Sequence, residues 1–207
     1  MTPLLNRLLL ALCFVLPGLA LAEAQAKATE GPLELVRNTA DEVLKKVVAE
    51  KQTLKQHPGR IYDLVEKGVV PHFDFERMSR LAVGRYWRRA TPAQKKAFAE
   101  AFKQLLVRTY ATALLEYSNQ PIRYMPLRPS SRPDEAMVAT RVDNGGPLVP
   151  INYRLHFENG EWKVYDVIVD GVSLVSNYRS SFSSQIRRYG MDGLISRLQK
   201  HNQKQSG

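Results

Sequence analysis

The sequence predicts an α+β domain in which about six helices pack against an antiparallel sheet of four strands. Three observations predict this class. Residues 31–118 have helical periodicity, residues 122–169 contain alternating segments separated by turn signals, and residues 172–198 return to helical periodicity. Helices and strands that are segregated along the chain in this way are typical of α+β domains with helices on one sheet face.

The first helical region divides into four expected helices. An apolar stripe covers positions 36–48, a shorter stripe follows the breaker at 57–59, and a third helix spans about 73–83. The strongest start signal lies at Thr91, which can cap the next helix, while Gln94 completes a capping box. This long helix carries one apolar face: Phe98, Phe102, Leu105, Leu106, Tyr110, Ala113, Leu114 and Tyr117.

The middle of the chain predicts the sheet. Residues 151–157 alternate between apolar and polar side chains, as in a strand with one buried face. Asn159-Gly160 predicts a two-residue hairpin turn into a strand at 162–169. Residues 136–142 form a similar strand, and residues 122–127 are expected to be extended because prolines surround them.

The last third of the chain predicts two more helices. Asp170 precedes Gly171 and an apolar periodic segment, so we expect Asp170 to cap the helix that follows. That helix runs for about five turns until Gly190 stops it, and a short final helix covers 194–198.

The first 22 residues resemble a secretory signal. Arg7 precedes the apolar run 8–16, and Ala20-Leu21-Ala22 fits a cleavage site before Glu23. The apolar run is too short for a transmembrane anchor. We therefore expect an exported, soluble chain without an anchor, consisting of a single domain over 23–207.

Composition limits the chemistry of the mature chain. Its ends, 23–30 and 201–207, are expected to be disordered. The only cysteine, Cys13, leaves with the signal, which excludes disulfides and thiol chemistry. Without the 22 signal residues, 29 basic residues face 20 acidic ones across 185 residues, a net charge of +9. This charge suggests an anionic partner or simply a solvated basic surface, and export argues against nucleic acid.

Two groups of cations stand out along the chain. We call them the first and the second basic cluster. Tyr86 and Trp87 lie within the first one, and aromatic residues among cations suit a membrane–water interface or a docking surface. A solvated face remains an equal interpretation of the second one. The first basic cluster is Arg85, Arg88, Arg89, Lys95 and Lys96; the second is Arg179, Arg187, Arg188, Arg197 and Lys200.

Residues suited to catalysis are scattered. The histidines lack metal-ligand spacing and are interpreted as isolated surface residues, so we expect no metal, no cofactor and no enzyme. Asp74, Asp166 and Asp170 adjoin apolar residues, which leaves a general base open, but capping and turn roles fit them better. The four histidines are His57, His72, His156 and His201.

Two segments resemble the signatures of the MlaC family of periplasmic toluene-tolerance proteins. The first signature is similar to Phe73-Asp74-Phe75-Glu76-Arg77-Met78-Ser79, followed by the Val83 to Trp87 segment, by Thr91 to Gln94 and by Phe98. The segment from Val169 to Arg179 (VDGVSLVSNYR) is similar to the second. The match covers essentially the whole mature chain.

The resemblance implies a soluble periplasmic phospholipid carrier that is monomeric. It implies a cone-shaped fold like that of nuclear transport factor two, with a curved sheet wrapped by helices and acyl tails between them. Its implied partners are phospholipids, an outer-membrane lipoprotein–porin complex and an inner-membrane ABC transporter with a ring-forming lipid-binding subunit. The implied role is to maintain the lipid asymmetry of the outer membrane.

Periodicity, rather than the family signatures, predicts which side chains contact the tails. They lie on the inward faces of the long helix, the sheet and the last long helix, and the first basic cluster is a candidate for partner docking. Replacing Leu106 or Leu155 by arginine is expected to empty the pocket without unfolding the chain. The expected tail contacts are Phe98, Phe102, Leu106, Tyr110, Leu114, Val138, Tyr153, Leu155, Val164, Val167, Val172 and Val175.

Two other functions remain open at this stage. Cone-shaped folds also host isomerases and dehydratases, which need a titratable group in the pocket floor. A periplasmic binding or chaperone module would use its surface and have a filled core. The signature residues Asp74, Trp87, Asp170, Asn177 and Tyr178 are interpreted mainly as residues that fix the fold.

Overall fold

A computed structural model describes residues 30–117, 119–143 and 145–204. The expected signal at 1–22 and the loose end at 23–29 lie outside the described residues. No helix within the described ranges is both long and apolar enough to cross a bilayer. The helices are α1 (Pro32–Ala49), α2 (Lys51–Gln56), α3 (Arg60–Gly68), α4 (Phe75–Val83), α5 (Pro92–Ala111) and α6 (Leu174–Lys204), with short 3-10 helices η1 (Val70–His72), η2 (Gly84–Arg89) and η3 (Thr112–Glu116).

The strands form one antiparallel sheet in the order β1-β2-β3-β4-β5, which confirms the predicted fold class with five strands instead of four. The additional strand, β5, has two residues and is too short to show alternation. The strands are β1 (Ile122–Tyr124), β2 (Glu135–Val142), β3 (Val149–Glu158), β4 (Glu161–Val169) and β5 (Val172–Ser173).

Two tight hairpin turns lie at the two ends of β4. Asn159 and Gly160 have positive φ angles of 53° and 83°, as the predicted two-residue turn requires. Asp170 and Gly171, with φ angles of 49° and 81°, form a second turn of this kind between β4 and β5. The prediction that Asp170 caps a helix is therefore wrong, because the turn leads into a strand and α6 begins only at Leu174.

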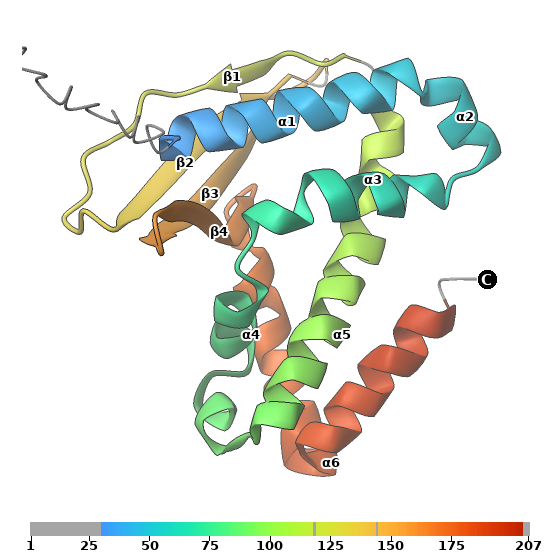
Figure 1. Ribbon diagram of the computed structural model, residues 1–207, viewed down its shortest axis with the longest axis vertical. Helices are drawn as coiled ribbons and strands as arrows, with labels where there is room; N and C mark the ends of the chain where they lie inside the picture. Colours follow the sequence, from blue (N-terminus) through green and yellow to red (C-terminus); the bar gives the residue numbers. More distant parts are fainter. Residues whose placement is uncertain (1–29, 118, 144, 205–207) are drawn as a thin grey trace, which may run out of the picture.

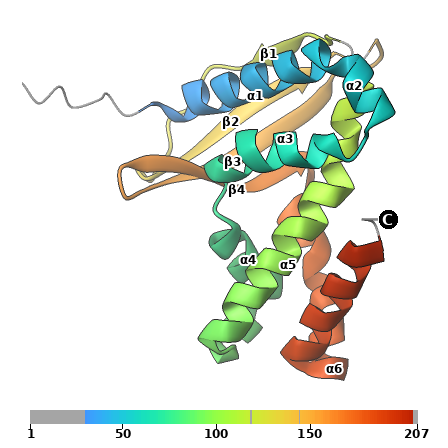
Figure 2. The same ribbon diagram turned by 45° about the vertical axis from the view of Figure 1, so that its right-hand side comes forward.

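The helices separate into two groups (Figure 1). Helices α1 and α3 lie on one face of the sheet, and the turned view agrees (Figure 2). Helices α4, α5 and α6 with η2 form a second body at the lower end, which we call the base. Helix α5 runs through both parts, from its start in the base to its end beside α3.

Capping residues set the helix boundaries in the base. The Thr91 side chain accepts a hydrogen bond from the Gln94 N–H (3.2 Å), and the Gln94 side chain accepts one from the Thr91 N–H (3.0 Å), so the predicted capping box is confirmed. Asp74 Oδ1 accepts from the Arg77 N–H (2.8 Å) and caps α4. Within α6, Gly190 has φ 72° and ψ 177°, which breaks the helix where the sequence predicts.

Disorder was expected at 201–207; residues 201–204 differ from this expectation, and 205–207 lie outside the described residues. Helix α6 continues through residues 201–204, and Asn202 is buried there. Its side-chain amide donates a hydrogen bond of 2.9 Å to the carbonyl of Ala101 in α5. The polar composition of residues 201–204 concealed this tertiary contact, which ties the last turn to the base.

Candidate functional site

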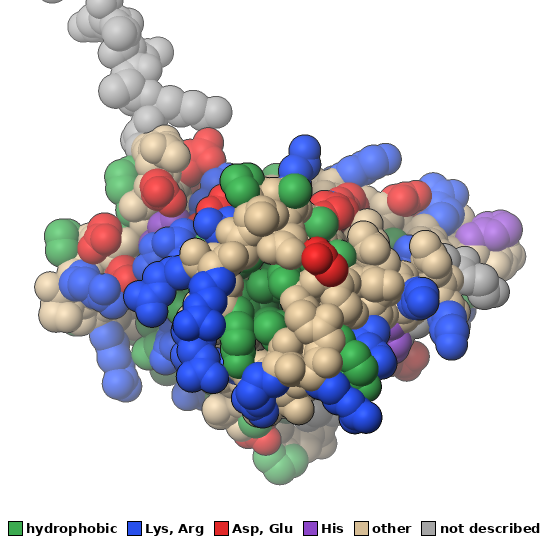
Figure 3. Space-filling view, turned by 90° about the horizontal axis from the view of Figure 1, so that it is seen from below, with side chains coloured by type: hydrophobic (Ala, Val, Ile, Leu, Met, Phe, Trp, Pro, Cys, Tyr) green, Lys and Arg blue, Asp and Glu red, His purple; other side chains and the backbone are tan. Residues whose placement is uncertain are grey.

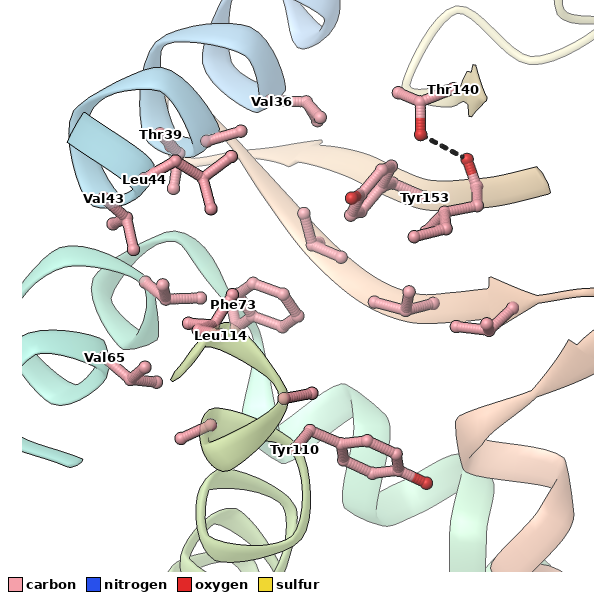
Figure 4. Close-up of a pocket in the computed structure, with 18 of the residues that line it drawn as sticks. Val36, Thr39, Val43, Leu44, Val65, Phe73, Tyr110, Leu114, Thr140 and Tyr153 are labelled. Carbon is pink, nitrogen blue, oxygen red and sulfur yellow. Dashed lines mark hydrogen bonds between the residues drawn. The ribbon is translucent and has the colours of Figure 1, made fainter. Parts of the chain in front are cut away.

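An apolar cavity of about 510 Å³ lies between the helices of the upper part and the sheet. This volume is typical of small-molecule sites, which run from about 300 to 1,000 Å³. Side chains of α1, α3 and the end of α5 point toward those of the strands across it (Figure 4). Its walls include Val36, Thr39, Val43, Leu44, Val65, Phe73, Tyr110, Leu114, Thr140 and Tyr153.

Helical and strand periods explain how the chain builds these walls. In α1, residues spaced by three or four positions, such as Val36, Ala40 and Val43, face the cavity. In the sheet, every second residue does so, as with Ile151 and Tyr153 in β3. The pairing of β3 with β4 shifts register between Arg154 and Leu155, and such a bulge bends a sheet.

Most polar side chains that line the cavity carry neutral hydroxyl groups. Thr140 Oγ1 donates a hydrogen bond of 2.9 Å to the Ile151 carbonyl. Burial raises the pKa of Tyr153. Burial, with the neighbouring Tyr178 as a second cause, raises the pKa of Tyr110 to about 12. Among the described lining residues, the one carboxylate is that of the exposed Glu116, so the inner walls suit an uncharged, apolar ligand.

The cavity opens to solvent beside η3. Tyr110 is 37% exposed, and the lining residues Ala113 and Glu116 that follow it are also exposed. The Tyr124 hydroxyl of β1 donates a hydrogen bond of 3.4 Å to Asp41 Oδ1 of α1. Burial raises the pKa of Tyr124, and the Asp41 charge adds to this. An edge strand and α1 are therefore held together by a neutral phenol.

Half of the residues predicted to contact acyl tails line this cavity. The contact itself stays a prediction for all twelve. Helix α1 and Phe73 were missed as walls, although the stripe at 36–48 already showed an apolar face that needed a partner. Leu106, Tyr110, Leu114, Tyr153, Val164 and Val167 line the cavity, and Phe98, Phe102, Val138, Leu155, Val172 and Val175 lie outside its walls.

The residues outside the walls have three kinds of environment. Phe98, Phe102 and Val175 are buried in the core of the base. Val138 and Leu155 are each 0% exposed within the layer between sheet and helices, and Val172 is 56% exposed in β5. One apolar face of α5 thus serves a filled core at its start and a cavity at its end.

His156 is buried, so its interpretation as a surface histidine is wrong. Its Nε2 lies 2.8 Å from Asp74 Oδ2, and its exposed fraction is 3%. With Glu158 these side chains form the one group of described residues close enough to share a metal ion. The hydrogen bond to Asp74 already accounts for the burial of His156, and it links β3 to the start of α4.

The signature residues hold mostly structural positions. Trp87 is 6% exposed in the core of the base, and Tyr178 stacks on Phe182 with ring centroids 5.2 Å apart. Asp74 caps α4, while Asn177 is exposed on α6. The family signatures therefore mark residues of the base and of its connection to the sheet, and not residues of the cavity wall.

The first basic cluster does not surround the cavity. Its members belong to η2 and the start of α5, at the end of the molecule opposite to α1 and the sheet (Figure 1). Lys95 is half-buried and the other four are exposed. A docking role for these residues stays a prediction.

An α+β fold with a large apolar cavity defines a binding protein for apolar small molecules. The family profile described as MlaC protein matches residues 37–200, and the chain belongs to this family. The chain is 33% identical over 193 residues to the toluene tolerance protein ttg2D of Pseudomonas putida, with 93% of this chain and 87% of that protein covered.

Further relatives agree in sequence and in fold. The intermembrane phospholipid transport system binding protein MlaC of Haemophilus influenzae is 26% identical over 193 residues, covering 91% of this chain and 90% of that protein. The structure is similar to that of a phospholipid-binding protein from Ralstonia solanacearum, solved in complex with a phospholipid. The TM-score is 0.76 at 33% identity, over 84% of this chain and 97% of the other.

Proposed function

We propose that this chain is a phospholipid carrier that buries acyl tails in the cavity between α1, α3, α5 and the sheet. The observation that carries the proposal is the cavity of about 510 Å³, whose inner walls are aliphatic and aromatic with neutral hydroxyls. Family membership and the phospholipid-bound relative from Ralstonia solanacearum support the choice of ligand. The binding region is one domain that follows the proposed signal.

The energetics of lipid movement make such a carrier necessary. Exposing one methylene group to water costs ~0.8 kcal/mol. Two acyl chains with ~30 methylene groups between them therefore meet a barrier on the order of 24 kcal/mol. A protein that encloses the tails removes most of this barrier. Because the walls contact tails and not headgroups, the carrier is expected to accept phospholipids with different headgroups.

The proposed location and partners follow the family. The carrier works in the periplasm and moves lipid between an outer-membrane lipoprotein–porin complex and an inner-membrane ABC transporter with a ring-forming lipid-binding subunit. This traffic maintains the lipid asymmetry of the outer membrane. The name of the relative in Haemophilus influenzae, which includes intermembrane phospholipid transport, supports this assignment.

The two other functions have less support. A surface-binding module with a filled core does not need a cavity of this size. An isomerase or dehydratase needs a titratable group in the pocket floor, and Glu116 lies at the exposed edge.

Native mass spectrometry of protein purified without denaturant tests the proposal, together with solvent extraction of the same sample. We expect one or more bound phospholipids in the wild type. In Leu114→Arg the guanidinium enters the apolar cavity and the lipid is lost. The matched control is Leu81→Arg, which places the same charge at a 41% exposed position of α4. A wild-type protein that is recovered folded and free of lipid, and that takes up none from vesicles, would overturn the proposal.

A further inference from the structure

The lower end of the molecule combines many cations with few acids. Residues 84–98 and 184–200 together hold nine lysines and arginines and a single carboxylate, Asp192. Asp192 Oδ1 accepts a hydrogen bond of 2.9 Å from the Gln94 side chain. In the view from below, lysine and arginine side chains gather at this end around an apolar patch (Figure 3). The charge is therefore concentrated on one end of the molecule.

The fold joins the two basic clusters at Tyr86. Arg85 Nη2 donates a hydrogen bond of 3.2 Å to the Tyr86 hydroxyl, and its guanidinium lies 5.1 Å from the centre of that ring. The pKa of Tyr86 is lowered, first by this hydrogen bond and further by Arg187 of α6. Cations from two separate elements, η2 and α6, thus both act on the hydroxyl group of Tyr86.

None of these cations is neutralised by a neighbouring acid. Among the ion pairs of the described residues, no member of either basic cluster takes part. Like charges held on one end of a protein repel each other, and an opposing layer of negative charge relieves that repulsion. Guanidinium groups in particular match the oxygens of phosphate groups.

Aromatic rings lie between the cations of the base. Tyr189 is 40% exposed, and the guanidinium carbons of Arg188 and Arg197 lie 5.2 Å and 3.9 Å from its ring centre. The Lys95 amine lies 5.7 Å from the Trp87 ring. Exposed tyrosine flanked by arginine is typical of side chains at the boundary between lipid and water.

We propose that the base is a docking surface for an anionic phospholipid bilayer. The cations come from η2, the start of α5 and the turn of α6 at Gly190, which share one end of the molecule and can meet an extended plane of phosphates together. The proposal rests on the proposed function only in its choice of a lipid surface as partner. Because the cavity lies in the upper part, the bilayer contact leaves the bound lipid enclosed.

Co-sedimentation of the protein with vesicles tests this proposal. The probes are vesicles of phosphatidylcholine alone and of phosphatidylcholine mixed with phosphatidylglycerol. We expect binding to the mixed vesicles that weakens as salt is added. Each cation near an anionic surface contributes about a fivefold gain in partitioning, so Arg85→Gln/Arg187→Gln is expected to bind roughly 25-fold more weakly.

The control removes the same charge elsewhere. Lys45→Gln/Lys55→Gln changes two exposed lysines of α1 and α2, far from the base, and is expected to change vesicle binding much less. An equal loss in both double variants overturns the proposal, because net charge alone would then explain binding. So does equal binding to neutral vesicles. Binding to polyglutamate without binding to mixed vesicles overturns it in favour of an acidic protein partner.

Lipid content separates this proposal from the carrier function. Native mass spectrometry is expected to show bound phospholipid in the wild type and in both double variants. A wild type that binds vesicles but never contains lipid refutes the carrier and leaves the docking surface in place. A lipid-filled wild type that ignores anionic vesicles refutes the docking surface alone.

Discussion

The base and the upper part of the molecule use the same kinds of apolar side chain and pack them differently. In the base, Phe98 and Phe102 are each 0% exposed and meet Phe182 edge-on at 5.6 Å and 5.4 Å. In the upper part, walls of comparable hydrophobicity surround about 510 Å³ of open space. The difference shows that an apolar helix face specifies burial, while the elements opposite decide between a filled core and a cavity.

Helix α5 has both kinds of packing along its own length. Its start meets α6, whose aromatic side chains Tyr178 and Phe182 fill the space between the helices. Its end meets α3 and the sheet, whose mainly aliphatic side chains do not reach across. The aromatic residues of α6 therefore close the base, whereas the mainly aliphatic side chains of α3 and the sheet leave room for a ligand at the end of α5.

The largest expected effect concerns the filled layer that bounds the cavity. Leu155 is 0% exposed and lies outside the cavity walls, so Leu155→Arg buries an unpaired charge. We expect a loss of about 5 kcal/mol or more, comparable to the whole stability of a domain. This differs from the sequence-based expectation that Leu155→Arg keeps its fold.

The matched variant is Leu106→Arg, at a lining position, which is expected to fold and to lose lipid. Circular dichroism measures whether each variant folds, and lipid extraction measures whether it contains lipid. If both variants fold equally well and contain equal lipid, the distinction between the filled layer and the cavity wall is wrong.

Truncation of one side chain at each end of α5 tests the comparison directly. Phe102→Ala leaves a hole in the aromatic core and is expected to lower the free energy of unfolding by about 3 to 5 kcal/mol. Leu114→Ala, at a half-buried position that already faces open space, is expected to lower it by about 1 kcal/mol. Urea unfolding of both variants measures the difference. Equal losses would mean that the cavity is filled in solution.

A smaller effect is expected at the junction between the two parts. Asp166 of β4 accepts hydrogen bonds from the Ser173 hydroxyl (2.7 Å) and the Val175 N–H (3.3 Å), and so fixes the start of α6. Asp166→Ala leaves these donors unpaired and is expected to cost about 2 to 3 kcal/mol. Asp192→Ala, at an exposed position of the base, serves as control and is expected to cost ~0.5 kcal/mol or less. Equal costs would exclude a special role for the junction.

The sequence was sufficient for much of the fold because local signals were strong. The Thr91 capping box, the Asn159-Gly160 turn and the break at Gly190 each depend on neighbouring residues, and each was confirmed. Asp170 was assigned to a helix because an acid before glycine suits both a cap and a hairpin turn. The two-residue strand β5, which decides between them, has no periodicity to detect.

The cavity walls were only partly predictable for a related reason. Periodicity identified the inward faces of α5 and the sheet, but position along those faces decides whether a residue meets the cavity. Leu106 lines the cavity whereas Phe102, one turn earlier on the same face, is enclosed by Tyr178 and Phe182. That outcome depends on where α6 crosses α5, which no local pattern of α5 encodes.

The burial of His156 could not be predicted from its neighbours in the sequence, because its hydrogen-bond partner, Asp74, is 82 positions away.

The smallest expected effect distinguishes the two parts by the ionisation of tyrosine. The pKa of Tyr110, at the cavity, is raised from 10.0 to about 12, mainly by burial, whereas the pKa of Tyr86, in the base, is lowered by the hydrogen bond from Arg85. The contribution of Tyr110 to stability is complete below pH 10 and is lost as the pH rises toward about 12. The contribution of Tyr86 to stability has the opposite pH dependence. It grows as the pH rises, because the folded protein favours the ionised form of this tyrosine.

Absorbance titration of tyrosinate measures both groups. Tyr86→Phe is expected to remove an early step of the alkaline titration, and Tyr110→Phe a late one. Lipid in the cavity further reduces the access of water to Tyr110, so loading is expected to delay the late step and leave the early step unchanged. If loading shifts both steps equally, or neither, the ligand does not reach the end of α5. The division of α5 into a structural half and a binding half would then have to be abandoned.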